Sequence, residues 1–333
     1  MDKVEISSIQ DDLDFIYNSS IFELNPTFPD NALEIIDKYH KGGDLTITTG
    51  DEYFGERDNL YKVIDFCKSK SYKIKILTSS LKKIKYGVNP LVNFLCWSRN
   101  ISTDHSEIDN KIIRYFDKSY YNDDITKTIK FNLIWRLSTH SRNELISGIS
   151  NTNVNDNLDY QIEYHRNDPK YGNVITSKLR PWRELIEIYN KSLLSFVVET
   201  EYWHGCQIQV DKEFKSTEII PFTEKLIIPF LSKSMPILFG GDNYIKSIEE
   251  LGLFVFNEEF GITDTTTESY NKAIKNLKSK SFEEINSIYQ KNIEKIESNY
   301  KLISNILFSP LPYIINKIDT NPEWPRQLKQ NQR

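Results

Sequence analysis

Two short apolar runs with a helical segment between them occupy the stretch from Phe196 to Phe239, which constrains the fold more than any other part of the chain. The first run ends at Val198 and the second covers Met235–Phe239. Short apolar runs bounded by turn residues are typical of strands buried on both faces, as in parallel sheets. A strand, helix, strand succession indicates an open α/β sheet, in which ligands bind beside the carboxyl ends of the strands.

Polar residues follow both of these strands and open the helix between them. Glu199 follows the first strand, Gly240–Gly241 follow the second, and Thr223-Glu224-Lys225 stand at the helix start. A glutamate in the first helical turn suits the positive end of the helix dipole, whereas a lysine there does not. Lys225 is explained if an anion such as a phosphate binds at the helix start, and the alternative is that its side chain points into water.

The chain has 333 residues, a formal charge of −5 and a sequence pI near 5.7. This length suggests two domains, and the acidic balance argues against a protein that coats nucleic acid, although a local basic cleft is compatible with it. The three cysteines form no CxxC pair and indicate neither a disulfide framework nor a zinc site. Because no signal-peptide core and no run of ~18 apolar residues is found, a cytoplasmic protein without a membrane span is predicted.

Strand-like and helical segments alternate along most of the chain, which predicts βαβ units and mostly parallel sheets. In the first half, strands are predicted at 45–48 and 72–78 around a helix at 56–70, and another apolar run follows at 91–97. In the second half, the predicted strands are 130–135, 160–164, 195–198, 235–239 and 253–256, and the predicted helices are 143–149, 182–191, 244–250, 267–278 and 282–307. The predicted domains are 1–128 and 129–310, with a tail at 311–333.

Several common catalytic motifs are absent from the sequence. It contains no GxxxxGK[ST] loop, no GxGxxG after a strand, no GxSxG and no HExxH, so a P-loop nucleotidase is not expected. The five histidines have no metal-ligand spacing and are interpreted as structural or surface residues. Asp12-Leu13-Asp14 resembles a manganese-binding triplet of some sugar transferases, but it lies outside any strand end and is interpreted as chance. No metal site is therefore predicted.

A pair of arginines provides a second anion-binding feature. Arg136 and Arg142 lie between a predicted strand and a predicted helix, where a guanidinium group presents a planar fork to phosphate oxygens. These residues, together with the segments FVVETE, FTEKLIIPFLSKSMPILFGG, YIKSIEELGLFVFNEEFG and ESYNKAI, resemble the carboxyl-terminal half of the fucosyltransferase-like glycosyltransferases, especially the short phage and giant-virus members. The family usually has an R-x-x-R-x-H-R run at the arginine segment. This chain keeps the outer arginines but lacks the middle arginine and the histidine.

The resemblance implies an α/β protein of two facing Rossmann-like domains with a central cleft, the arrangement called GT-B. It implies a glycosyltransferase of the hexosyl or deoxyhexosyl class, inverting and metal-independent, whose nucleotide-sugar is a substrate and not a cofactor. Glu224 is then expected to contact the ribose and Lys225 a phosphate. Arg136 and Arg142 are expected to neutralise the leaving diphosphate, and Glu199 to orient the sugar or the acceptor. The other expected donor-site residues are Thr223, Gly240 and Gly241.

An inverting transfer also needs a carboxylate that acts as general base on the acceptor hydroxyl, and the resemblance places it in the amino-terminal domain. The candidates follow the first strong predicted strand, and they are Asp51, Glu52 and Glu56. For each of them, the alternative is an ordinary surface acid.

Two other functions stay open at this point. One is a nucleotide-handling α/β enzyme without sugar chemistry. The other is a catalytically degenerate GT-B domain that binds glycans or proteins, which the altered arginine run favours, whereas the helix-start lysine favours an active enzyme. The sequence does not specify the donor sugar or whether the acceptor is a glycan, a protein or a nucleic acid. For a viral protein, the predicted location becomes the host cytoplasm.

Overall fold

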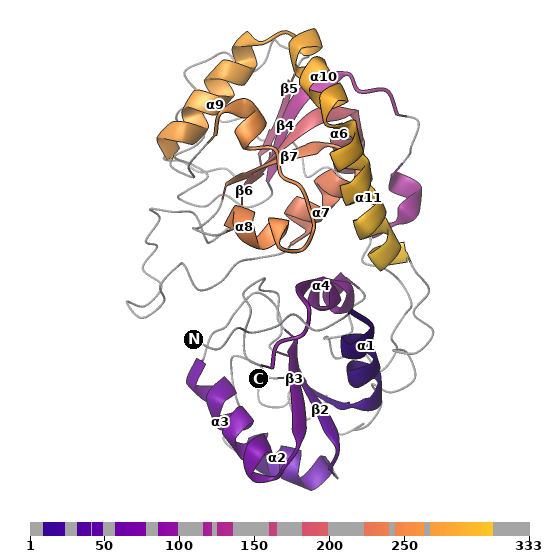
Figure 1. Cartoon of the computed structure of the whole chain (residues 1–333), viewed down its shortest axis with the longest axis vertical. Helices are drawn as coiled ribbons and strands as arrows, with labels where there is room; N and C mark the ends of the chain where they lie inside the picture. Colours follow the sequence, from indigo (N-terminus) through magenta and orange to yellow (C-terminus); the bar gives the residue numbers. More distant parts are fainter. Residues whose placement is uncertain are drawn as a thin grey trace. The chain divides into compact units, whose positions relative to one another are not determined.

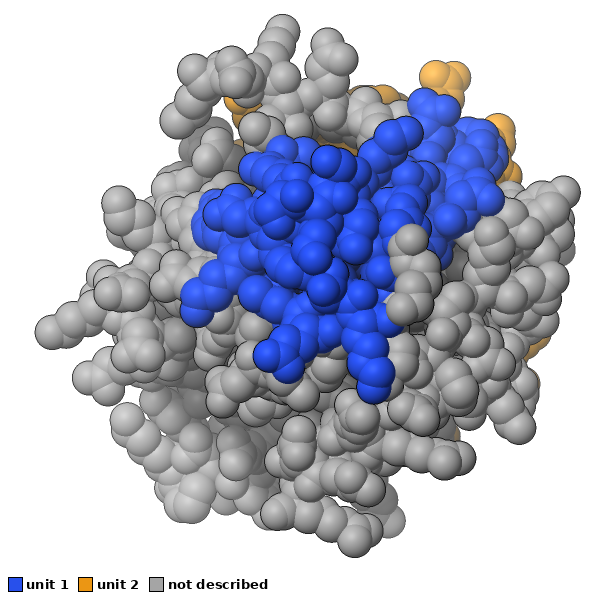
Figure 2. All heavy atoms as spheres, turned by 90° about the horizontal axis from the view of Figure 1, so that it is seen from below, with its two compact units in different colours: residues 1–113, 309–333 blue, residues 114–308 orange. Residues whose placement is uncertain are grey.

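The computed structural model describes twelve stretches of the chain: 9–23, 32–40, 42–48, 57–77, 86–98, 116–121, 125–135, 160–164, 182–198, 223–239, 244–262 and 267–308. The chain divides into two compact units, residues 1–113 with 309–333 and residues 114–308 (Figures 1 and 2). The predicted domain boundary after residue 128 lies inside the second unit. Residues before that boundary are held there by Asn190 Nδ2, which donates to the Tyr120 carbonyl at 2.7 Å.

The first unit contains a parallel three-stranded sheet in the order β1-β2-β3, of which Figure 1 labels β2 and β3. Its strands are β1 (Ser20–Glu23), β2 (Asp44–Thr48) and β3 (Lys73–Leu77), and its helices are α1 (Ile9–Asn18), α2 (Ala32–Tyr39), α3 (Arg57–Ser69) and α4 (Pro90–Ser98). The crossover helices α2 and α3 pack on one face, where Ile36 and Val63 share a core with Ile76. Side chains alternate along a strand, so Leu77 faces the other way and packs against Val92 of α4.

A buried ion pair ties α1 to this sheet. The side chain of Asp12 is fully buried and pairs with Lys75 Nζ of β3, while its second carboxylate oxygen accepts the backbone N–H of Asn89 at 2.6 Å. Asp14 is exposed and accepts a hydrogen bond from Gln10 Nε2 at 2.8 Å. The two acids of the Asp12-Leu13-Asp14 triplet therefore lie in different environments, and Asp12 has a structural partner.

The second unit contains a parallel four-stranded sheet in the order β5-β4-β6-β7. Its strands are β4 (Ile129–Trp135), β5 (Tyr160–Tyr164), β6 (Ser192–Val198) and β7 (Met235–Phe239). Its helices are α6 (Trp182–Lys191), α7 (Glu224–Leu231), α8 (Tyr244–Glu249), α9 (Thr267–Ser279), α10 (Phe282–Lys291) and α11 (Ile293–Phe308). The chain leaves β4 in one direction to form β5 and then crosses back to add β6 and β7 on the other side. This is the doubly wound order of Rossmann-like sheets.

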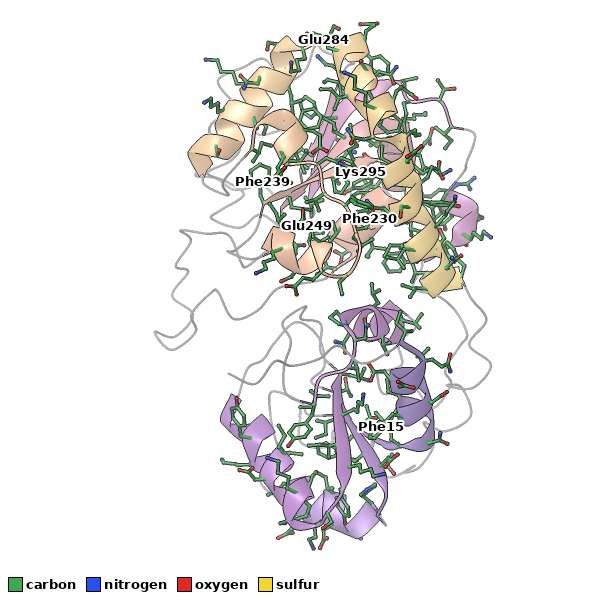
Figure 3. The ribbon with its side chains drawn as sticks, in the orientation of Figure 1. Phe15, Phe230, Phe239, Glu249, Glu284 and Lys295 are labelled. Carbon is green, nitrogen blue, oxygen red and sulfur yellow. The ribbon has the colours of Figure 1, made fainter. Side chains whose placement is uncertain are left out.

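Helices cover both faces of the second sheet. The crossover helices α6 and α7 contact each other and the strands, and α11 packs against α7. On the opposite face, α9 and α10 share a core with a row of three phenylalanines from adjacent strands. The rings of Phe131 and Phe196 are 5.5 Å apart edge to face, and those of Phe196 and Phe239 are 6.0 Å apart and stacked. Figure 3 shows Phe239 and, on α7, Phe230 inside the unit, both essentially buried.

Two asparagine side chains fasten an extended segment along the edge of this sheet. Asn257 is buried, accepts the Leu238 N–H and donates to the Leu238 carbonyl, both at 2.9 Å. Asn299 of α11 makes the same pair of bonds to Phe254, both at 2.8 Å. The prediction of a strand at 253–256 is therefore wrong. Side-chain amides hold this segment instead of a ladder of backbone hydrogen bonds, and the Phe256 N–H makes one backbone bond to β7, to the Pro236 carbonyl.

One apolar run without a predicted type is a helix, and one other prediction needs correction. The apolar run at 91–97 is the helix α4, since Pro90 starts it and its apolar residues pack against α1 and β3. The helix predicted at 282–307 is two helices, because Asn292 caps α10 and its Nδ2 returns to the Ile288 carbonyl at 3.1 Å. The strands and helices predicted elsewhere in the described residues are confirmed, whereas β1, α1 and α2 were not predicted and the helix at 143–149 lies outside those residues.

None of the helices in the described part of the chain is both long and apolar enough to cross a membrane.

Replacing Asn257 by alanine tests the amide clasp, the pair of hydrogen bonds between the Asn257 side chain and the backbone of Leu238 in β7. The change leaves the Leu238 N–H and carbonyl unpaired in a buried place, at a cost of about 1–3 kcal/mol for each group. We expect the free energy of unfolding to fall by roughly 2–4 kcal/mol, measured by urea denaturation. The exposed Asn276→Ala on α9 is the control and should stay within about 0.5 kcal/mol of the unmodified chain. Equal stabilities of the two variants would show that the clasp contributes nothing.

Candidate functional site

The four strands of the second unit end at the same level. Trp135 of β4 pairs with Tyr164 of β5, and Val198 of β6 pairs with Phe239 of β7. Leu133 of β4 pairs with Phe196 of β6, so the same register carried two residues further sets Trp135 beside Val198. The carboxyl ends of the strands therefore form one even edge.

The residues proposed from sequence for donor binding follow this edge directly in the sequence. Arg136 comes after the last residue of β4, Glu199 after that of β6, and Gly240 after that of β7. These three residues, together with Arg142 and Gly241, lie outside the described residues.

The strand order indicates which position on the carboxyl edge is expected to bind a ligand. The chain reverses its direction of strand addition between β4 and β6, which are neighbours in the sheet. In doubly wound sheets the crevice for a ligand opens at the carboxyl ends of the two strands at this reversal. Arg136 and Glu199 are the residues that follow these two strands.

The helix α7 begins beside the same edge, because it connects β6 to β7. Thr223 is its N-cap: the residue is extended and buried, and its Oγ1 accepts the backbone N–H of Lys225 at 3.3 Å. The N–H groups of Leu226 and Ile227 donate to the Thr223 carbonyl, both at 3.2 Å. All residues from Leu226 to Leu231 are buried, which fixes the helix between the strands, α6 and α11.

Glu224 and Lys225 form an ion pair at the start of α7. Lys225 Nζ lies 3.1 Å from Glu224 Oε1 and 3.5 Å from Thr223 Oγ1. Only 18% of the Lys225 side chain and 17% of the Glu224 side chain are exposed, so the alternative in which Lys225 projects into water is wrong. The carboxylate offsets the unfavourable position of an ammonium at the positive end of the helix dipole.

This arrangement defines what the helix start can bind. The first-turn amides of Lys225, Leu226 and Ile227 already donate to Thr223, so the Lys225 side chain, rather than these amides, is the group at the helix start that is suited to an anion. A phosphate that bonds to Lys225 competes with Glu224 for the ammonium. The released carboxylate is then an acceptor for hydroxyl groups, such as those of a ribose.

The acids predicted as general bases follow β2 in the sequence. Asp51, Glu52 and Glu56 lie outside the described residues, which end at Thr48 and resume at Arg57. Thr48 is the last residue of β2, the central strand of the first sheet, and it is level with Glu23 and Leu77 at the ends of the neighbouring strands.

No three His, Cys, Asp or Glu side chains come close enough to hold a metal ion within the described stretches. His40, the histidine that falls in them, is buried with its ring edge-on to Tyr72 at 4.5 Å. Burial lowers the pKa of His40, against the opposing effects of the Gly43 backbone and the Asp44 charge. A structural role for this histidine agrees with its interpretation from sequence.

Two polar features of the second unit were not predicted. Asn132 of β4, Ser195 of β6 and Ser234, the residue before β7, form a buried row with both side-chain contacts at 2.8 Å. Lys127, just before β4, and Lys130, near its start, donate to carbonyls at or just after helix ends. Asn132 in the middle of an apolar run was the sequence signal for the row, but the lysines gave none because lysine is common on surfaces.

Comparison with protein-family models, with curated protein sequences and with solved structures gave no match to this chain.

Replacing Thr223 by alanine tests how the helix start is held. Loss of an N-cap hydroxyl costs ~1 kcal/mol within a range of about 0.5–2 kcal/mol. We expect Thr223→Ala to lower the free energy of unfolding by this amount, as measured by urea denaturation, and Thr223→Ser to retain most of it because serine keeps the hydroxyl. An alanine variant as stable as the serine variant would mean that Thr223 does not cap α7.

Proposed function

We propose that this protein is a glycosyltransferase that transfers a sugar from a nucleotide-sugar donor to an acceptor hydroxyl, with inversion and without a metal. The two parallel α/β units are consistent with Rossmann-like units, and the proposal takes them to be the two domains of a GT-B enzyme.

One observation carries the proposal. Three strands of the second sheet end level with one another, and each is followed in sequence by a residue suited to a nucleotide-sugar: Arg136, Glu199 and Gly240. The half-buried Glu224–Lys225 pair opens the helix between two of these strands. A cation beside a carboxylate suits a ligand that presents both phosphates and hydroxyl groups.

The chemistry assigned to these residues follows from their charges. Lys225 binds a donor phosphate, and Glu224 accepts hydrogen bonds from the ribose hydroxyls. Arg136 and Arg142 stabilise the negative charge that develops on the leaving diphosphate, which is a task for fixed cations. Glu199 orients the sugar or the acceptor. A carboxylate among Asp51, Glu52 and Glu56 takes the proton of the acceptor hydroxyl as it attacks the sugar.

Calorimetry with a panel of nucleoside diphosphates and nucleotide-sugars, with EDTA present, tests the donor site. A charge-assisted hydrogen bond to phosphate contributes roughly 1.5–3 kcal/mol, so Lys225→Ala should weaken nucleoside diphosphate binding about ten- to hundredfold. Lys191→Ala is the matched control, because this exposed lysine precedes β6 at the opposite edge of the sheet. It should bind like the unmodified chain.

Each outcome of this titration leads to a definite conclusion. No binding of any member of the panel contradicts a nucleotide-sugar enzyme and favours a degenerate binding module. Binding that needs manganese contradicts the metal-independent mechanism. Binding with equal affinity by Lys225→Ala and Lys191→Ala removes Lys225 from the donor site.

The general base is tested by rates of transfer at saturating donor. Loss of a general base typically lowers the rate by about 10²–10⁴-fold and leaves donor binding intact. We expect one of Asp51→Ala, Glu52→Ala and Glu56→Ala to show this loss with unchanged nucleotide affinity, and its amide variant to be equally slow. Normal turnover in all three alanine variants would exclude this group of acids as the base.

A further inference from the structure

The ion pair at the start of α7 joins two residues that are adjacent in the chain. Neighbouring residues of a helix point about 100° apart and do not face each other, so the 3.1 Å contact between Glu224 and Lys225 requires both side chains to bend toward one another. Lys225 Nζ also lies 3.5 Å from Thr223 Oγ1, which keeps the ammonium at the beginning of the helix. The helix dipole opposes a cation at this end, and the carboxylate of Glu224 offsets it.

The carboxylate of Glu224 stands at the ammonium where a ligand anion would have to bind. Both side chains of the pair are largely buried, so water screens their charges less than it screens those of a surface pair. A phosphate that approaches Lys225 meets a cation whose charge is already offset, and it meets a negative charge close by. A like charge within about 4–6 Å of a charged group changes its equilibrium constants by about tenfold or more. The pair should therefore disfavour a simple anion.

A ligand that carries hydroxyl groups beside its phosphates meets a different balance. Its phosphate can take the ammonium while its hydroxyl groups donate to the released carboxylate, so that neither buried charge loses its partner. Pyrophosphate has the phosphate charges but no ribose or sugar hydroxyls. It would leave the carboxylate of Glu224 unpaired beside its own negative charge.

We propose that Glu224 is a selectivity residue: it excludes inorganic phosphates from Lys225 and admits ligands in which phosphates and hydroxyl groups lie side by side, as in a nucleoside diphosphate. This inference rests on the proposed function, because it takes Lys225 to be the group that binds a donor phosphate. A glutamate that only accepted hydrogen bonds from a ribose would leave the binding of pyrophosphate unchanged when it is replaced. The selectivity role predicts that the binding of pyrophosphate becomes tighter.

Calorimetric titration of the full chain with inorganic pyrophosphate, with EDTA present, tests the exclusion. Glu224→Gln keeps the size of the side chain and removes its charge, whereas Glu224→Ala removes the side chain. Both variants should bind pyrophosphate about ten- to hundredfold more tightly than the unmodified chain. Unchanged or weaker binding by both variants overturns the proposal.

Glu187→Gln is the matched control for this titration. Glu187 also pairs with a lysine, Lys191, at 2.6 Å, but it lies in α6. That helix ends at the amino edge of the sheet, where the strands begin. Glu187→Gln should bind pyrophosphate like the unmodified chain.

Titration of the same variants with nucleoside diphosphates tests the selectivity. Loss of the carboxylate removes the competitor for Lys225 and also the acceptor for the ribose hydroxyls. Glu224→Gln should therefore gain about tenfold less affinity for a nucleoside diphosphate than for pyrophosphate. An equal gain for the two ligands would mean that Glu224 repels every phosphate alike, and it overturns the proposal.

Lys225→Ala separates a failure of this inference from a failure of the proposed function. If Lys225→Ala and the unmodified chain bind pyrophosphate and nucleoside diphosphates equally, Lys225 binds no phosphate and both proposals fail. If Lys225→Ala weakens nucleoside diphosphate binding but neither Glu224 variant tightens pyrophosphate binding, only the selectivity role fails. The double variant Glu224→Gln/Lys225→Ala should lose the gain for pyrophosphate, because the gain depends on the ammonium. A gain that persists in the double variant places pyrophosphate elsewhere and overturns the proposal.

Discussion

The parallel pairing of strands whose ends lie at the same level is the constraint on which the rest of the second unit depends. Because β4, β6 and β7 are parallel and in level register, each connecting helix must return along the sheet in the opposite direction. Every such helix therefore starts at the carboxyl edge and ends at the amino edge. This single condition separates the residues that follow strands, such as Glu199, from the helix ends that Lys127 joins.

The groups that offset the charge of a lysine side chain differ between the two edges of the sheet. At the amino edge, Lys127 and Lys130 donate to the carbonyls at helix ends, where the dipole favours a cation, and burial lowers the pKa of Lys127. At the carboxyl edge, Lys225 lies at a helix start, where the dipole is unfavourable, and Glu224 compensates it from 3.1 Å away. The same residue type is thus held by backbone dipoles at one edge and by a side-chain charge at the other.

Much of the fold was predictable from the sequence because strands buried on both faces consist of consecutive apolar residues, which a local pattern reveals. Met235–Phe239 and 160–164 are strands with the predicted bounds, and α7 begins within the Thr223-Glu224-Lys225 segment that was expected to open a helix. Predictions failed where a distant partner decided the outcome. The segment at 253–256 has strand-like residues, but Asn257 and Asn299 hold it with side chains. The run at 91–97 had no predicted type, and its packing on β3 and α1 shows that it is a helix.

The sequence by itself determined the α/β class, the positions of most strands, and the residue types that follow the strands, since these depend on local hydrophobicity and capping. It placed Thr223, Glu224 and Lys225 together because they are neighbours in the chain. Only the tertiary structure decided the strand order β5-β4-β6-β7, which makes β4 and β6 adjacent. It alone brought Lys127 within reach of Asn190 and Ser232, 63 and 105 residues away in the chain. Contacts over such separations depend on how helices pack on a sheet, and no local pattern encodes them.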